Sequence, residues 1–283
     1  MPDLPQHSEG PARAPNRDRT RLRGYSRIEL LASLGGLLTL LFLALPTLGA
    51  RRGISDLALC HSSQRALVQA WLLYAEDHAG RLVGNLGFDS LQLSLTNRGW
   101  AVGRLDNTTY RNEHTNLATL RDALLGRYLD SLSVFRCPLD PSLHRGTNGV
   151  PRVRSVSMNH YVGTTDADAR RTLSDFSAPP PSRVFVFLEE REDSIDDPDF
   201  LADAFNPTRT APEKASFRSY PGDWHDGTGV LGFADGHAES WRWRDPRTRP
   251  PHRTARRLEY DLPSPRNADI ERLQAAALPQ TTP

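Results

Sequence analysis

The sequence has little of what marks the common chemical classes of protein. Its charges nearly cancel, with 35 Lys and Arg against 34 Asp and Glu and a net charge of +1 over 283 residues. A nucleic-acid-binding protein needs an excess of basic charge to neutralise phosphates, so composition makes no case for one. Lys214 is the only lysine, and we give this preference for arginine no functional weight.

Cysteine is also scarce. Cys60 and Cys137 are the only two, and they are too few and too far apart in sequence for a zinc framework. They do suit one disulfide, which would form if this part of the chain lay in an oxidising compartment. The alternative is a pair of buried free thiols, since cysteine packs as a small hydrophobe.

Enzyme signatures are missing as well. The chain has no nucleophile elbow, no phosphate-cradling glycine loop and no histidine pair at helical metal-ligand spacing. Histidine and carboxylate side chains do gather late in the chain, at Asp223, His225, Asp226, Asp235 and His237. They could serve a metal-dependent or acid-base enzyme, but a β-hairpin explains the stretch without catalysis. We expect no enzyme, and we expect His225 to anchor the start of a strand by a hydrogen bond.

Long apolar runs are absent except for one. Residues 30–50 carry no charge, and as a helix they would extend about 31 Å, enough to cross the hydrocarbon core of a membrane. Glu29 lies just before the run. Inserting an ionised carboxylate at the centre of a membrane helix costs roughly 2.5 to 3.5 kcal/mol, so a charge beside such a run suggests a function. Residues 1–24 are rich in proline and arginine, which predicts a disordered leader held in the cytoplasm.

Residues 24–31 read Gly-Tyr-Ser-Arg-Ile-Glu-Leu-Leu. This stretch resembles the processing site of type IV prepilins and of type II secretion pseudopilins, with Tyr25 in place of the usual Phe and a charge at Arg27. The resemblance implies cleavage by prepilin peptidase between Gly24 and Tyr25, followed by methylation of the new amine. It also implies that Glu29 pairs with the N-terminal ammonium of a neighbouring subunit, which neutralises both charges.

A second helical pattern follows the apolar run. Apolar and aromatic residues recur at steps of seven, four, three and four, at Cys60, Leu67, Trp71, Tyr74 and His78. This spacing predicts one helix face packed against a sheet, with Gly80 as the stop. Residues 60–82 resemble the corresponding segment of one branch of the prepilin-like family. A shorter helix is predicted within 116–132, and another within 267–277.

Residues 184–188, Val-Phe-Val-Phe-Leu, predict a central buried strand, and residues 153–159 predict a second strand. Seven carboxylates crowd the eleven positions that follow residue 188. Such a loop could bind calcium, for which the candidate ligands are Asp193, Asp196, Asp197 and Asp199. The spacing does not match an EF-hand, and an acidic solvated surface is the alternative.

Residues 224–237 carry the most specific pattern outside the N-terminal region. Nine residues separate His225 from the pair Asp235-Gly236, and this spacing resembles that of bacterial prepilin-like proteins with a His-x9-Asp-Gly segment. Residues 230–234 and 237–243 predict two strands of a hairpin. Asp235 and Gly236 would form a two-residue type I′ turn, which needs positive φ at both positions.

Together these features predict an α+β, pilin-like fold, in which a long N-terminal helix, half membrane span and half amphipathic, packs on an antiparallel sheet. The expected parts are a leader over 1–24, a transmembrane helix over 25–50, a head over 51–245 and a Pro/Arg-rich tail over 246–283. We expect a single-pass inner-membrane protein with a cytoplasmic N-terminus and a periplasmic or extracellular head.

The expected function is that of a subunit of a type II secretion pseudopilus or type IV pilus-like filament. Its expected partners are prepilin peptidase, other pilin-like subunits and the inner membrane, with no nucleic acid and no cofactor apart from the calcium alternative. The alternative function is a membrane-anchored protein that does not polymerise and whose head binds a ligand or partner.

Overall fold

The computed structural model describes residues 26–87, 89, 93–105, 113–143, 149–203, 211–252 and 258–277, with the side chains of 42–55 excepted. The chain divides into two compact units, Met1–Ala50 and Arg51–Pro283, and each is described by itself. The tail therefore belongs to the same unit as the head. The predicted leader, with Gly24 and Tyr25 at its cleavage site, lies outside the described residues.

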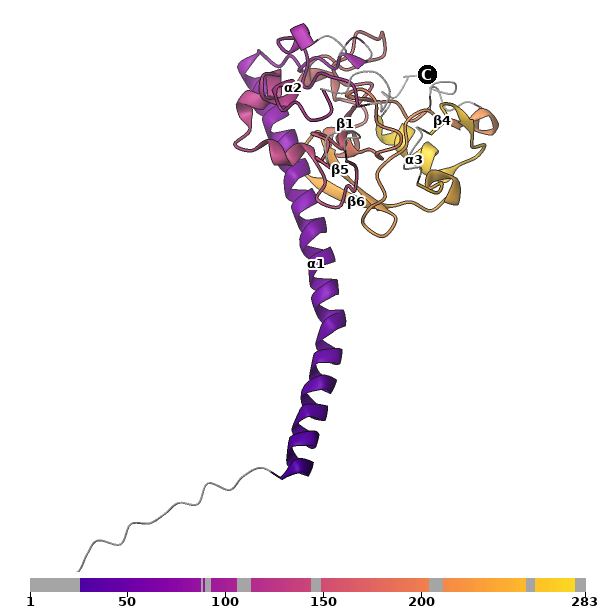
Figure 1. Ribbon diagram of the computed structural model, residues 1–283. Helices are drawn as coiled ribbons and strands as arrows, with labels where there is room; N and C mark the ends of the chain where they lie inside the picture. The colour runs from indigo at the N-terminus through magenta and orange to yellow at the C-terminus, as the bar shows by residue number, and fades with distance from the viewer. Residues whose placement is uncertain are drawn as a thin grey trace, which may run out of the picture. The chain divides into compact units, whose positions relative to one another are not determined.

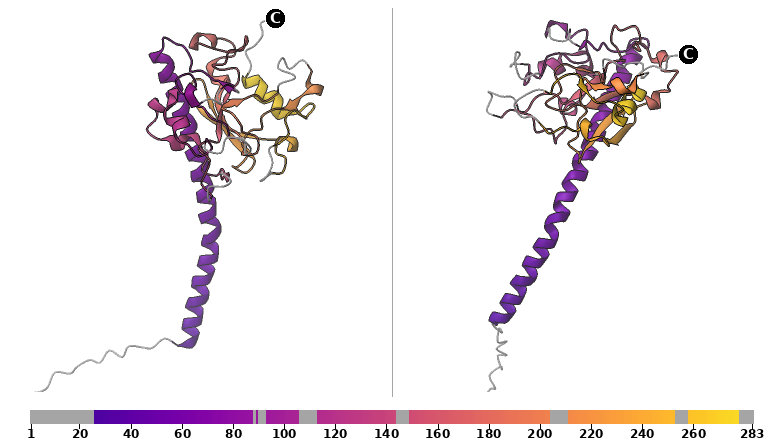
Figure 2. Two further views of the ribbon diagram at one scale, coloured as in Figure 1. Left: turned by 45° about the horizontal axis from the view of Figure 1, so that its top comes forward. Right: turned by 90° about the vertical axis from the view of Figure 1, so that its right-hand side faces the viewer.

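Helix α1 (Arg27–Asp77) is one continuous helix of 51 residues, visible in Figures 1 and 2. A capping box starts it, because the backbone N–H of Ser26 donates to Glu29 Oε2 (2.8 Å) and the N–H of Glu29 donates to Ser26 Oγ (3.2 Å). The helix ends as predicted near Gly80, whose φ of 79° lets its N–H turn back to the carbonyl of Ala75 at 2.7 Å.

The predicted membrane span is wrong. Among the helices of the described residues, none combines the length and the apolar character needed to cross a membrane. The transmembrane helix over 25–50 and the single-pass inner-membrane location are corrected accordingly.

The region between α1 and the sheet is built from short helical turns. They are η2 (Leu93–Leu95), α2 (Ala118–Arg121), η3 (Leu124–Tyr128) and η4 (Leu132–Phe135). The short helix predicted within 116–132 is present as α2, although it has only four residues and 3-10 turns follow it. Ala123 adopts an extended backbone, with ψ of 163°, and breaks the helix between α2 and η3.

The main sheet has five strands in the order β3-β1-β2-β5-β6. Their bounds are β1 (Val156–Asn159), β2 (Phe185–Glu189), β3 (Asp199–Phe200), β5 (Thr228–Phe233) and β6 (Ala238–Arg242). Strand β2 lies at the centre and is buried at every position, which confirms the predicted central strand. The remaining strands, β4 (Ser216–Phe217) and β7 (Leu262–Pro263), form a small antiparallel sheet of their own.

The sheet is mixed, not antiparallel as predicted. β1 pairs antiparallel with β2 but parallel with β3. Glu189, at the end of β2, lies opposite Val156, at the start of β1. After Glu189 the chain is therefore beside the start of β1. When it passes to the other side of β1 and forms β3, it runs in the same direction as β1, and the two strands pair in parallel.

The β5–β6 hairpin forms as predicted, but its turn is of another type. Gly236 has a φ of 97°, whereas Asp235 is not among the described residues with positive φ. The N–H of Gly236 donates to the carbonyl of Phe233 (2.9 Å), and the N–H of Phe233 donates to that of His237 (2.8 Å). The type I′ turn is therefore corrected to a wider turn with a single left-handed glycine.

Apolar side chains cover both faces of the sheet. On one face Leu67, Val68 and Trp71 of α1 pack against β1 and β2, as the helical spacing predicts. On the other face Ile270 and Leu273 of α3 (Ala268–Ala277) pack against Phe185, Leu231 and Trp241. Figure 1 shows β1, β5 and β6 between α1 and α3. The elements thus form three layers, with β2 buried in the middle one.

Candidate functional site

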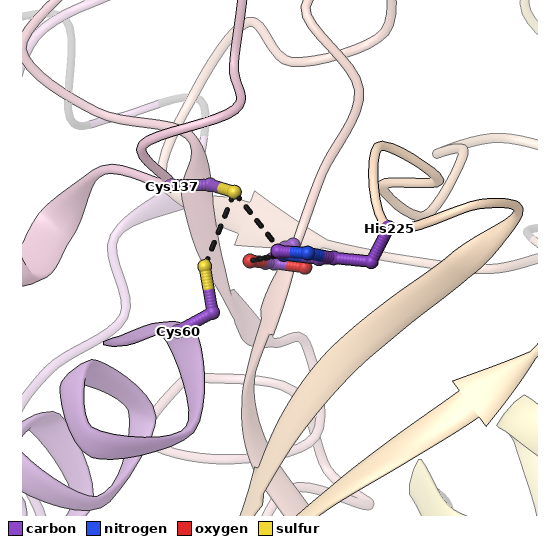
Figure 3. Close-up of side chains that lie close together, drawn as sticks. Cys60, Cys137 and His225 are labelled. Carbon is purple, nitrogen blue, oxygen red and sulfur yellow. Dashed lines mark hydrogen bonds and ion pairs between the residues drawn. The ribbon is translucent and has the colours of Figure 1, made fainter. Parts of the chain in front are cut away.

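Two thiols, an imidazole and a carboxylate meet in the interior of the second unit (Figure 3). Cys60 Sγ lies 3.1 Å from Cys137 Sγ, and Cys137 Sγ lies 3.3 Å from His225 Nε2. His225 Nε2 lies 3.4 Å from Glu189 Oε1. The four atoms all lie within 4.8 Å of one another. We call Cys60, Cys137, Glu189 and His225 the thiol–histidine cluster.

Each member of the cluster comes from a different part of the chain. Cys60 lies on α1, Cys137 follows η4, Glu189 ends β2, and His225 lies in the loop before β5. Cys137 is fixed by its backbone, because its N–H donates to Ser155 Oγ at 2.8 Å. The cluster therefore joins the helix to the central strand and to the hairpin.

The cluster is closed to solvent. Cys60, Cys137 and Glu189 are each 2% exposed, and His225 is 9% exposed. Apolar side chains pack around the thiols, from Leu57, Leu139, Trp224, Val230 and Ala238. Polar contacts are stronger in such surroundings, and a buried polar group without a partner is costly. Each of the four side chains therefore needs the others as partners.

The pKa values in the cluster move in opposite directions. Burial alone would lower the pKa of His225, but hydrogen bonds and charge from Cys137 and Glu189 outweigh it and raise this pKa to about 10. The hydrogen bond from Cys60 lowers the pKa of the Cys137 thiol, and His225 lowers it further. The bond to Cys137 and burial raise the pKa of Cys60. These contacts thus stabilise the charged forms of both groups, the Cys137 thiolate and the His225 imidazolium.

The contacts of His225 argue against a catalytic triad. In such a triad the nucleophile and the orienting carboxylate contact different ring nitrogens. Here Cys137 and Glu189 both contact Nε2, while Nδ1 is buried and has no hydrogen-bond partner among the described residues. The arrangement brings donors toward one point, which suits binding at that point better than proton relay.

The sequence anticipated part of this site. Cys60 and Cys137 meet, as the predicted disulfide requires, and the structure holds both as free cysteines. His225 anchors the region before β5 through Cys137 and Glu189, consistent with its predicted anchoring role. The sequence analysis missed Glu189, which looked like the first residue of an acidic surface run. The signal available was its place directly after four buried strand positions.

Asp235 and Gly236, the other members of the spacing motif, lie in the hairpin turn and not in the cluster. Asp235 Oδ1 accepts the backbone N–H of His237 at 3.2 Å, which stabilises the turn. The nine residues of the spacing are therefore the six of β5 with two before them and one after them, between a buried histidine and a turn.

The calcium candidates do not share one centre among the described residues. Each carboxylate has a protein partner: Arg191 for Asp193, Tyr260 and Arg104 for Asp196, the backbone N–H of Asp199 for Asp197, and Asn85 and His160 for Asp199. Calcium binding by these residues stays a prediction, because Asp196, Asp197 and Asp199 line one cavity but form no close group of ligand atoms among the described residues.

A polar cavity of about 440 Å³ forms a second candidate site. Its lining includes Asn85, Arg104, His160, Asp199, Arg218 and Tyr260. Two carboxylates flank the ring of His160, with Asp199 Oδ2 at 2.6 Å from Nδ1 and Asp166 Oδ2 at 2.7 Å from Nε2. Burial lowers the pKa of His160, but the two carboxylates raise it by more, so this pKa rises to about 9.

No protein-family model, curated protein or solved structure matches this chain. The likeness of residues 24–31 and of the His-x9-Asp-Gly spacing to prepilin-like proteins therefore rests on those residues alone. The expected methylation and the expected role in protein secretion receive no support and are withdrawn.

Proposed function

We propose that the chain is the structural subunit of a pilin-like filament and assembles through the N-terminal part of α1. The observation that carries this proposal is a set of exposed apolar side chains on that part of the helix. Each is between 54% and 79% exposed: Ile28, Leu30, Leu31, Leu34, Leu37, Leu38, Leu40 and Leu41. Contiguous apolar surface of this kind marks an interaction site in a folded protein.

The exposed leucines surround the helix. Leu30, Leu34, Leu37 and Leu41 follow steps of four, three and four, which define one face, whereas Leu31, Leu38 and Leu40 lie to other sides. A helix that is apolar all round is buried all round in its working state. A single groove would cover one face only. The core of a helical filament supplies neighbouring subunits on every side, so we take other copies of this helix as the occupants.

Glu29 has a place in this assembly. It is exposed, and the hydrogen bonds from the backbone and hydroxyl of Ser26 lower its pKa, which keeps the carboxylate charged at neutral pH. We propose that prepilin peptidase cleaves after Gly24 and that the freed ammonium of one subunit pairs with Glu29 of the next. In this pair the two charges neutralise each other, whereas either charge without a partner would be costly in an apolar filament core.

The proposal is tested on the full chain, expressed with and without prepilin peptidase. We expect mass spectrometry to find a chain that begins at Tyr25 only when the peptidase is present, and electron microscopy to find filaments only after this cleavage. Leu34→Asp should abolish filaments, since it places a charge among the exposed leucines. The matched control is Leu143→Asp in the head, where the leucine is similarly exposed at 51%. A chain that keeps Arg23 beside active peptidase, or filaments formed by Leu34→Asp, would refute the proposal.

A second candidate function is supported by the polar cavity around His160. In that case the head binds a small polar ligand and the chain does not polymerise. The cavity is large enough for a small molecule and offers both cationic and anionic side chains, Arg218 and Asp199 among them. A chain that stays monomeric after cleavage, and that binds a ligand only while His160 is intact, would favour this function over the filament.

A further inference from the structure

We propose that the thiol–histidine cluster is a zinc-binding site, in which Cys60 Sγ, Cys137 Sγ, His225 Nε2 and Glu189 Oε1 are the four ligands. The site lies in the head and involves no residue of the exposed leucine set, so this proposal stands apart from the filament. It also differs from the expectation that two cysteines are too few for zinc. The missing ligands are a histidine and a carboxylate distant in sequence.

The distances fit a tetrahedral centre. Zinc lies about 2.0 to 2.3 Å from nitrogen, oxygen and sulfur ligands, so tetrahedral ligand atoms are about 3.3 to 3.8 Å apart. Three separations in the cluster are 3.1 Å between the sulfurs, 3.3 Å from sulfur to nitrogen and 3.4 Å from nitrogen to oxygen. To seat the ion, the two sulfurs would move apart by about 0.7 Å, with smaller shifts of the other two ligands.

The donor set selects the metal. Two thiolates and an imidazole are soft or borderline ligands, which favour zinc over calcium or magnesium. Four protein ligands complete the coordination and leave no open position, as in structural zinc sites. The burial of all four side chains fits this reading, because a catalytic zinc needs access for water and substrate.

The surroundings already orient the ligands. Glu189 Oε2 accepts the backbone N–H of Val230 at 3.0 Å, which turns Oε1 toward His225. Ser155 Oγ accepts the backbone N–H of Cys137. Hydrogen bonds of this kind, one layer out from the ion, hold metal ligands in place.

A disulfide between Cys60 and Cys137 explains less of the site. It would account for the two sulfurs and leave Glu189 and His225 as a buried pair 3.4 Å apart, but it would not explain why this pair lies against the sulfurs. Buried carboxylates and imidazoles are costly unless they are paired or bind a metal. A zinc ion uses all four side chains at once and places positive charge among them.

The test measures zinc and thiols in the purified full chain. We expect one zinc per chain by elemental analysis, and two thiols that react with a thiol reagent only after denaturation with a chelator. Cobalt in place of zinc should give a thiolate-to-metal charge-transfer band. Recovery of a Cys60–Cys137 disulfide in metal-free protein, or of free thiols that take up neither added zinc nor cobalt, would overturn the proposal.

Variants assign the ligands. Glu189→Gln keeps an oxygen that can accept from Val230 but weakens the metal ligand, so zinc affinity should fall roughly 10 to 100-fold while the head stays folded. His225→Ala should also lose zinc. The matched control is His237→Ala, which removes a half-exposed histidine of the same hairpin and should keep one zinc per chain. Where His225→Ala does not fold, Glu189→Gln decides, and unchanged zinc affinity in that variant contradicts the ligand set.

Discussion

Ser26 and Glu29 cap the start of α1 with a reciprocal pair of hydrogen bonds, each side chain accepting the backbone N–H of the other residue. Glu29 therefore has a local role in a single chain, besides the role that the resemblance to prepilins implies. A substitution that removes both roles at once would not separate them, whereas the choice of replacement can.

Glu29→Gln should separate the two roles. A glutamine at this position still accepts the backbone N–H of Ser26, so the first turn of α1 should stay protected from amide hydrogen exchange. The charge is lost, so filament assembly should fail. Glu29→Ala should lose both the protection and the filaments, and Ser26→Ala should fray the first turn at a cost of about 1 kcal/mol. Filaments formed by Glu29→Gln would contradict the pairing role of the carboxylate.

His160 should make the stability of the head depend on pH. Its pKa of about 9 in the folded protein exceeds its ordinary value of 6.5, so the protonated ring stabilises the fold fully below about pH 6.5. This contribution falls as pH rises through 9. We expect His160→Gln to cost on the order of 2 kcal/mol at pH 6 and much less at pH 9.5.

Urea unfolding at both pH values measures the difference. The control is His78→Gln, because the ring of His78 contacts the backbone carbonyl of Tyr74 and not a carboxylate. A cost for His160→Gln that is equal at pH 6 and pH 9.5 would show that the flanking carboxylates do not hold the proton.

Gly232 marks a close approach of β5 to α1. A Cβ at this position would lie 2.7 Å from Val68 Cγ2 and 3.2 Å from the backbone oxygen of Gln64. Gly232→Ala should therefore push the strand from the helix and destabilise the head by about 1 to 3 kcal/mol in thermal or urea unfolding. Gly35→Ala is the control, because a Cβ there meets nothing within 4 Å. An unchanged midpoint for Gly232→Ala would contradict this packing.

Asp269 attaches α3 to the segment that follows the hairpin. Its Oδ2 accepts the backbone N–H groups of Arg244 and Asp245 and the hydroxyl of Thr248, at 2.9, 2.8 and 2.8 Å. Asp269→Ala leaves the buried hydroxyl of Thr248 and two part-buried N–H groups without this acceptor, so we expect a loss of about 1 to 3 kcal/mol in the free energy of unfolding. Glu271→Ala, an exposed neighbour on the same helix, should change it by less than about 0.5 kcal/mol. A cost below 1 kcal/mol for Asp269→Ala would show that α3 is held by its apolar face alone.

The sequence predicted elements whose signal is local. The face of α1 that carries Leu67 and Trp71 follows a helical period, and β2 follows from a run of β-branched and aromatic residues. The helix over 268–277 follows from its cap, since Asn267 Oδ1 accepts the N–H groups of Asp269 and Ile270. In each case the residues that determine the element are the residues that form it.

What the sequence did not predict depends on distant partners. The parallel pairing of β3 with β1 is set by where the chain crosses the sheet, and no residue of β3 signals it. Glu189 joins the cluster because β2 ends beside the loop of His225, 36 residues later. Cys137 and His225 are 88 residues apart. Spacing rules for metal sites cover short segments, so a site assembled from four elements escapes them.

The side-chain contact between His61 Nε2 and Ser240 Oγ, 2.6 Å long, joins residues 179 positions apart. At about 5 to 20 residues per second, a ribosome needs roughly 10 to 40 s to pass from one to the other. During that interval the strands that cover the apolar face of α1 are made one after another, and the face is incompletely covered until the last of them emerges. The newly made chain is therefore exposed to aggregation before its hairpin emerges, so its yield in cells should depend on a chaperone that binds an uncovered amphipathic helix.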